Sequence, residues 1–129
     1  MGAIIGAVAV GGAIGSVGRL LIGLAIQQRV GTTFPVGTLV INLTGSMLLG
    51  FIVRMVLDTS ADSPALRAFL TTGICGGYTT FSTFSFELAI LVEEGSTGRA
   101  ALYAAASVGL ALAGTFAGFA LARWVKGSG

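Results

Sequence analysis

The chain has 129 residues, of which 54% are hydrophobic and only 9% are charged, with 21 glycines and a mean hydropathy of +0.95. So few polar residues could not cover a soluble globule, which predicts an integral membrane protein with a single domain. The lone Cys75 and the lack of histidine exclude an internal disulfide, a zinc cluster and His-based catalysis. The formal charge of +2 forms no basic patch, so we expect neither a nucleic-acid partner nor an enzyme.

Four apolar runs follow one another along the chain, each close to the ~20 residues that a helix needs to cross ~30 Å of hydrocarbon. Because these runs are continuously apolar and do not alternate, helices are favoured over barrel strands. The predicted membrane spans are residues 2–28, 35–57, 66–93 and 99–124. They form one domain, 1–126, and residues 127–129 are expected to be a disordered tail or an expression remnant.

Charged and turn-forming residues separate these spans. The first span carries Arg19 in its last third, and the second begins at Pro35. Residues 58–64 (DTSADSP) form the clearest loop and divide the chain into two helical hairpins. The fourth span ends in an interfacial anchor in which Trp124 lies between Arg123 and Lys126.

Small residues recur at four-residue spacing within the spans. This spacing lets helix backbones approach closely in lipid, so it predicts tight helix packing. The glycine pairs are Gly2/Gly6, Gly11/Gly15, Gly73/Gly77 and Gly114/Gly118.

The cations are divided almost evenly between the two membrane faces that alternating helices would produce. One face holds Arg54, Arg67, Arg123 and Lys126, and the other holds Arg19, Arg29 and Arg99. Since the Lys/Arg asymmetry sets orientation, this balance allows insertion both ways and an antiparallel homodimer. A weakly biased single orientation is the alternative interpretation.

The third span is unusual because it reads TTGICGGYTTFSTFSFE from Thr71 to Glu87. A helix is weak around Gly76 and Gly77, since each glycine costs about 1 kcal/mol relative to alanine. Broken backbone survives in lipid only where protein or a water cavity buries it, and its free carbonyls suit a hard cation such as Na⁺. The alternative is an unbroken glycine-rich helix packed tightly on a neighbour.

Aromatic and amide side chains provide candidate contacts for an anion. Phe81 and Phe84 lie three residues apart on one helical face, where the positive edges of two rings could line an anion path. Such a pair could equally belong to the core or face lipid. Asn42 lies in mid-span, where its amide could link helices or could replace water around a small anion.

Hydroxyl and charged residues show the same ambiguity. Arg19 could extend to the interface or could concentrate anions at a vestibule, and Glu87 could be a functional acid or an interfacial cap. The hydroxyls could line a path or bond back to their own helix. They belong to Thr38, Thr44, Ser46 and Ser107.

Three blocks resemble one family. The stretches GGAIGSVGRLLIG (11–23), FPVGTLVINLTGSMLLGF (34–51) and TTGICGGYTTFSTFSFE (71–87) are similar, in this order, to the Fluc/CrcB family of fluoride channels. The resemblance implies a dual-topology homodimer with two antiparallel pores, which passively exports fluoride through the cell (plasma or inner) membrane. It also implies a central structural Na⁺, held by the backbone carbonyls of Gly76 and Thr79 from both subunits.

The same resemblance implies a set of residues along the fluoride path. Phe81 and Phe84 match the pore phenylalanines, and Asn42 matches the pore asparagine. The remaining implied pore residues are Arg19, Thr38, Thr83, Glu87, Tyr103 and Ser107. Ala111 departs from the pattern, because some members carry a second serine there.

Two other functions remain open at the level of the sequence. A proton-coupled exporter of the small multidrug transporter type needs a membrane-embedded glutamate in its first helix, and residues 1–18 contain no acid. Glu87 keeps this alternative in consideration. A subunit that only packs against a partner would need neither Asn42 nor the hydroxyl-rich third span.

Overall fold

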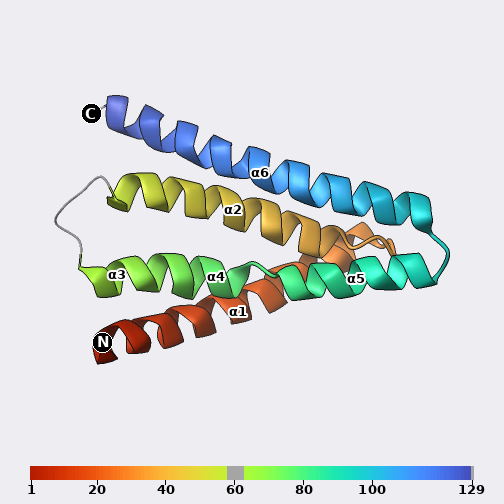
Figure 1. Ribbon diagram of the computed structural model, residues 1–129, viewed down its shortest axis with the longest axis horizontal. Coiled ribbons are helices and arrows are strands. Elements are labelled where there is room, and N and C mark those ends of the chain that lie inside the picture. The colour runs from red at the N-terminus through yellow and green to blue at the C-terminus, as the bar shows by residue number, and fades with distance from the viewer. Residues whose placement is uncertain (58–62, 129) are drawn as a thin grey trace.

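The computed structural model describes residues 1–57 and 63–128, and these residues form helices and no strands. The chain runs back and forth along the bundle, so that its two termini lie at the same end (Figure 1). Of the predicted loop at residues 58–64, residues 58–62 lie outside the described residues, Ser63 is the N-cap of α3, and Pro64 is the first residue of that helix. The elements are α1 (Gly2–Val30), α2 (Val36–Leu57), α3 (Pro64–Ala68), the π-helical segment η1 (Phe69–Cys75), α4 (Gly76–Tyr78), α5 (Phe81–Glu93) and α6 (Thr97–Gly127).

In the part of the chain that the structure describes, three helices are long and apolar enough to cross a membrane: α1, α6 and, over Val36–Val56, α2. The predicted all-helical membrane class is therefore confirmed. The predicted span 66–93 is divided among α3, η1, α4 and α5, the longest of which has 13 residues. Helix α6 ends at Gly127, the first residue of the predicted tail, and the Ser128 N–H donates to the Trp124 carbonyl.

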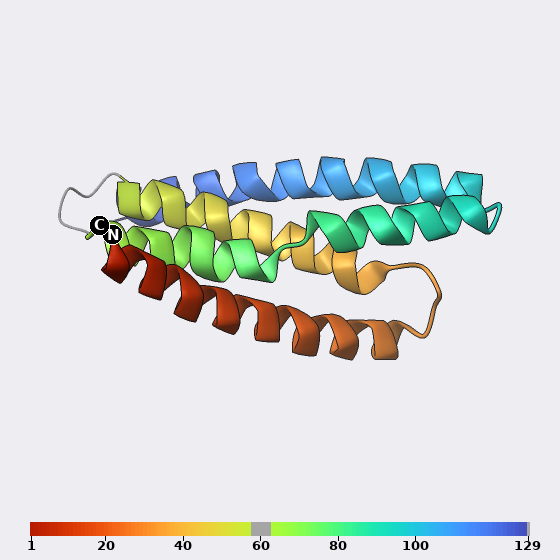
Figure 2. The same cartoon turned by 60° about the horizontal axis from the view of Figure 1, so that its bottom comes forward.

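The helices form two closely packed groups. The most extensive contact joins α2 to α6, while α1 packs along η1 and α4 and also touches α2 (Figure 2). The main buried cluster is small and lies at the far end from the termini, around Phe84, Leu91 and Tyr103. Large apolar side chains are exposed along α1, α2 and α6, as expected for helices whose outer surface faces lipid.

Glycine contacts determine how closely the helices approach. A Cβ on Gly11 would lie 2.6 Å from the Phe69 carbonyl oxygen, and one on Gly77 would lie 2.6 Å from the Gly12 oxygen. On α6, a Cβ on Gly118 would collide with the Met47 backbone. Three of the four predicted pairs therefore lie at helix contacts, whereas Gly2 and Gly6 have no neighbour within 4 Å of an added Cβ.

Gly118→Ala should destabilise the protein, because its methyl group would meet backbone atoms of α2 that cannot rotate away. Overpacking of this kind costs about 1–3 kcal/mol. The matched control is Gly109→Ala on the same helix, where a Cβ meets nothing within 4 Å. Thermal unfolding in detergent should show a lower midpoint for the first variant only, and equal midpoints would contradict the packing argument.

Candidate functional site

The helical backbone is interrupted at Thr79 and Thr80. Both residues are extended, with φ/ψ of −83°/157° and −150°/114°, between the end of α4 at Tyr78 and the start of α5 at Phe81. The expected weak point at Gly76 and Gly77 is wrong, because Gly76 is right-handed helical and Gly77 lies inside α4. Gly77 serves packing instead, since it lies directly against the backbone of Gly12 on α1, whereas Gly76 is exposed.

Asn42 on α2 bonds to the interrupted backbone. Its Nδ2 donates to the Thr80 carbonyl at 3.0 Å, and its Oδ1 accepts the Thr80 N–H at 2.8 Å. One side chain thus satisfies both polar backbone groups of an extended residue, which would otherwise be costly in an apolar environment. An amide carries two N–H donors, so the second N–H of Asn42 remains available to a ligand.

Thr80 also begins α5. Its Oγ1 accepts the Thr83 N–H at 3.1 Å as an N-cap and donates to the Thr83 hydroxyl at 3.0 Å. An N-cap side chain bonds the backbone N–H two or three residues later, and Thr83 is three residues after Thr80. The break is therefore a defined structure with a satisfied start to the next helix.

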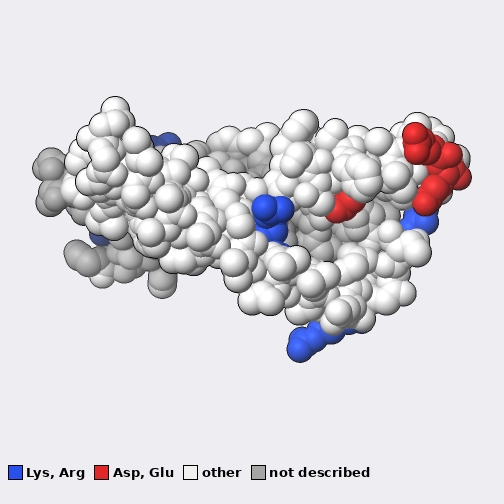
Figure 3. Space-filling model, turned by 90° about the horizontal axis from the view of Figure 1, so that it is seen from below, with Lys and Arg blue, Asp and Glu red and all other residues white. Residues whose placement is uncertain are grey.

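A groove of about 690 Å³ opens beside the break, lined by residues of α1, α2, α5 and the α1–α2 turn. We call it the arginine groove; among the residues that line it are Arg19, Gln27, Thr32, Thr38, Thr80, Thr83 and Glu87. Figure 3 shows this face hollowed, with basic surface at the edge of the hollow and acidic surface within it. Four of the implied pore residues, Arg19, Thr38, Thr83 and Glu87, thus meet in one groove.

Arg19 projects toward the break and not toward a membrane face. Its Nε donates to the Gly77 carbonyl at 3.1 Å, and the Ser16 hydroxyl donates to the same oxygen at 3.4 Å. Eleven residues separate Arg19 from the end of α1, which corresponds to about 16 Å of helix. The division of cations between the two membrane faces changes accordingly, since only Arg29 and Arg99 remain at the end of the bundle where α1 ends.

Two neutral donors hold the carboxylate of Glu87. The Thr38 hydroxyl donates to Oε1 at 2.7 Å, and the Tyr103 hydroxyl donates to Oε2 at 3.0 Å. Tyr103 is fully buried and packs edge-on against the rings of Phe34 and Phe84, at 5.5 and 5.1 Å between centroids. Tyr103 therefore supports Glu87 from the core and is not among the residues that line the arginine groove.

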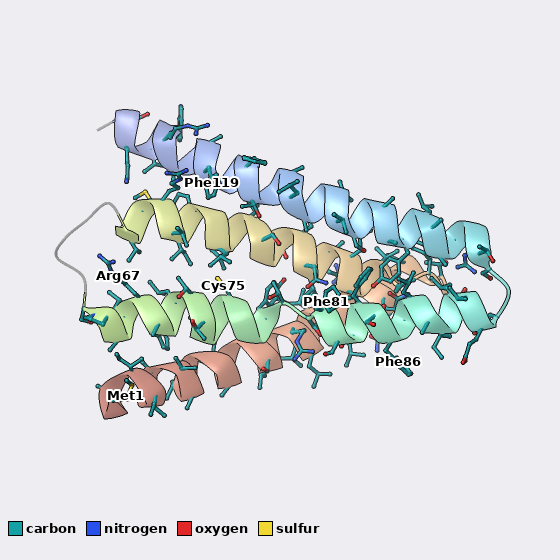
Figure 4. All side chains as sticks on the ribbon, in the orientation of Figure 1. Met1, Arg67, Cys75, Phe81, Phe86 and Phe119 are labelled. Carbon is teal, nitrogen blue, oxygen red and sulfur yellow. The ribbon has the colours of Figure 1, made fainter. Side chains whose placement is uncertain are left out.

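A second groove of about 280 Å³ lies on the other side of the break. We call it the phenylalanine groove; its lining includes Asn42, Ser46, Thr79, Thr80, Phe81, Phe84, Ser107 and Ala111. The Phe81 and Phe84 rings are 5.6 Å apart with planes inclined by 54°. Figure 4 places Phe81 beside the break, whereas Phe86 lies farther along α5 and Phe119 lies on α6.

Helix α6 contributes one polar residue, Ser107, to the phenylalanine groove. Ser107 is 8% exposed, and its Oγ has no hydrogen-bond partner among the described residues. Ala111 lines the groove one turn farther along α6, where it adds a methyl group and no hydroxyl. The hydroxyl track on α6 therefore stops at Ser107, since Thr115 donates to the Ala111 carbonyl of its own helix.

The carbonyls near the break are the candidate metal ligands. Gly76 is exposed, and the N–H that would normally bond its carbonyl in an α-helix, that of Thr80, is donated to Asn42 instead. Thr79 is extended, so its carbonyl also lies outside the helical pattern. Within the described ranges no group of three His, Cys, Asp or Glu side chains is placed to bind a metal.

Sequence reasoning missed two residues. Thr80 received no role, yet it alone among the described residues lines both grooves. Its position immediately after the TTGICGGYT stretch could have indicated a helix start. Gln27 received no role, and nothing in the pattern around it indicates the three backbone groups that its side chain bonds.

The fold and the two grooves define a class of protein: a multi-pass helical membrane protein with polar side chains gathered around a break in one helix. Comparison with protein families narrows this class. Residues 6–119 match the model described as CrcB-like protein, Camphor Resistance (CrcB), and the chain belongs to that family. The family resemblance inferred from the sequence is thus confirmed.

Several relatives are described as "Fluoride-specific ion channel FluC". The one from Rhizobium meliloti (strain 1021) is 50% identical over 116 residues, which cover 90% of this chain and 93% of the relative. The one from Rhodospirillum centenum is 46% identical over 117 residues, covering 91% and 93%. The one from Aquifex aeolicus is 44% identical over 115 residues, covering 89% and 93%. These names describe channels, which confirms the expected non-enzymatic class.

Proposed function

We propose that this chain forms a fluoride-selective channel in the cell membrane, through which fluoride leaves the cytoplasm passively. The family and the relatives' names support a fluoride channel. One structural observation supports it most: Thr80 lines both the arginine groove and the phenylalanine groove. The two grooves thus meet at the helix break, where the same threonine contributes to both.

The residues along this route suit a small, strongly hydrated anion. Arg19 would attract the ion at the arginine groove, and the hydroxyls of Thr80 and Thr83 line the way inward. Asn42 and Ser107 would then replace lost water with an N–H and an O–H in the phenylalanine groove. No Lys or Arg lines that groove, so the ion would not be held too tightly to leave.

The ring pair contributes positive edges without a fixed charge. Phe84 is 9% exposed and is fixed by Tyr103, whereas Phe81 is 80% exposed on this chain. A ring so exposed at the end of a polar route leaves the route open on one side. We propose that a second copy closes it, in an antiparallel homodimer with two pores.

A structural Na⁺ at the dimer centre fits the exposed backbone. Gly76 and Thr79 would supply carbonyl oxygens, which are the ligands that hard cations prefer. The helical stretch from Pro64 to Tyr78 ends at this point, and its C-terminal dipole favours a positive charge. Sodium would supply that charge and hold the two copies together. We propose that α3 to α5 jointly form the remaining membrane span.

The test is fluoride efflux from liposomes that contain the purified protein and are loaded with fluoride or with chloride. Wild-type protein should release fluoride and retain chloride. Phe81→Ile should slow fluoride release, because it removes the ring edges at the exposed end of the route. Phe116→Ile is the matched control, since Phe116 is also exposed but lies on α6 and lines neither groove.

Loss of flux in both phenylalanine variants would contradict a specific role for Phe81. An absence of fluoride movement in the folded wild-type protein would refute the channel. Proton-driven drug exchange that depends on Glu87 would then support the alternative, an exporter of the small multidrug transporter type.

A further inference from the structure

Gln27 bonds three backbone groups that do not belong to its own helix. Its Nε2 donates to the carbonyls of Thr32 and Phe34, at 2.6 and 2.9 Å, and its Oε1 accepts the Gly37 N–H at 3.0 Å. Both amide N–H groups and the amide oxygen are therefore in use. The side chain of one α1 residue thus spans the whole α1–α2 turn.

The bond to Gly37 acts as a cap on α2. The first four N–H groups of a helix have no partner within it, and Gly37 is the second residue of α2. Gly37 must also be small, since a Cβ there would lie 2.7 Å from the Gly23 carbonyl oxygen on α1. The start of α2 is consequently fixed against α1 by one hydrogen bond and one close backbone contact.

Two residues of this fixed segment are connected to Glu87, one by a direct hydrogen bond and one through Tyr103. Thr38 directly follows Gly37 and donates to Glu87 Oε1 at 2.7 Å. Phe34 lies in the turn, where its ring packs on Tyr103 with Arg99 above it, and Tyr103 donates to Glu87 Oε2. Gln27 lines the same groove as Glu87, but the bonds that connect them run through the turn.

We propose that Gln27 is a positioning residue of the channel: its amide fixes the α1–α2 turn so that the Thr38 and Tyr103 hydroxyls hold the carboxylate of Glu87 in the arginine groove. This inference rests on the proposed function, because its readout is fluoride flux. It assigns Gln27 no direct contact with the ion.

The experiment compares Gln27→Met with Gln28→Met in fluoride-loaded liposomes. Methionine keeps the length and helix propensity of glutamine but removes all three bonds. We expect flux at least about tenfold slower for Gln27→Met, and unchanged for Gln28→Met, because Gln28 is exposed and lines neither groove. If Gln27→Met does not fold, Gln27→Asn serves instead, since its shorter side chain cannot reach Gly37.

A double-mutant cycle with Thr38→Val separates positioning from a general effect on stability. If Gln27 acts through Thr38 and Glu87, the double variant Gln27→Met/Thr38→Val should show nearly the same flux as Thr38→Val alone. The inference would be overturned if the double variant lost flux by the product of the two single losses, or if the single variants at position 27 showed wild-type flux. Either result would leave the proposed channel function standing. Failure of the wild-type protein to move fluoride would refute the proposed function itself.

Discussion

Asn42→Leu is expected to reduce fluoride flux at least about hundredfold, to the level of empty liposomes. Leucine has a similar size but bonds neither the Thr80 N–H nor the Thr80 carbonyl, each of which Asn42 satisfies in the native structure. A buried polar group left without a partner costs about 1–3 kcal/mol. The variant would therefore both disturb the break and place an apolar group beside the point where the two grooves meet.

Thr115→Val is the matched control for Asn42→Leu. It also removes a polar group from a membrane helix, but the Thr115 hydroxyl bonds only the Ala111 carbonyl one turn earlier. Flux in this control should be close to that of the wild type. Flux is measured with a fluoride electrode, and only on variants that elute like the wild type in size-exclusion chromatography. Wild-type flux in Asn42→Leu would show that the amide is not needed on the route.

Thr80→Val is expected to reduce flux by a factor on the order of 100. Valine keeps the shape of threonine but removes the hydroxyl that caps α5 and bonds Thr83. Loss of an N-cap alone costs about 1 kcal/mol. The larger expected effect comes from the position of Thr80, which lines both grooves. An ion that has lost its water there needs the Thr80 hydroxyl as a hydrogen-bond donor, and no water would take its place.

Thr80→Ser provides the comparison that isolates the hydroxyl. Serine is an equally good N-cap and keeps the O–H, so its flux should stay within a fewfold of wild type. The same efflux assay applies to both variants. Equal losses in the valine and serine variants would contradict the argument, because serine keeps the hydroxyl.

Much of the candidate site followed from residue types in the second and third spans. The order of Asn42, Phe81 and Phe84 led to one anion route, and the structure brings all three into the phenylalanine groove. The position of the break did not follow, because glycine propensity pointed to Gly76 and Gly77. Gly77 is helical with the α1 backbone packed against it, whereas Asn42 offers Thr80 the bonds that a helix would have supplied.

The sequence by itself determined the membrane class, the helical content and the family, because apolar length and short motifs are local properties of the chain. Only the tertiary structure decided which polar atoms meet. Arg19 bonds the Gly77 carbonyl 58 positions away, Thr38 bonds Glu87 across 49 positions, and Gln27 spans a turn to cap α2. Such partners are selected by helix packing, which places distant residues side by side and leaves no local pattern in the sequence.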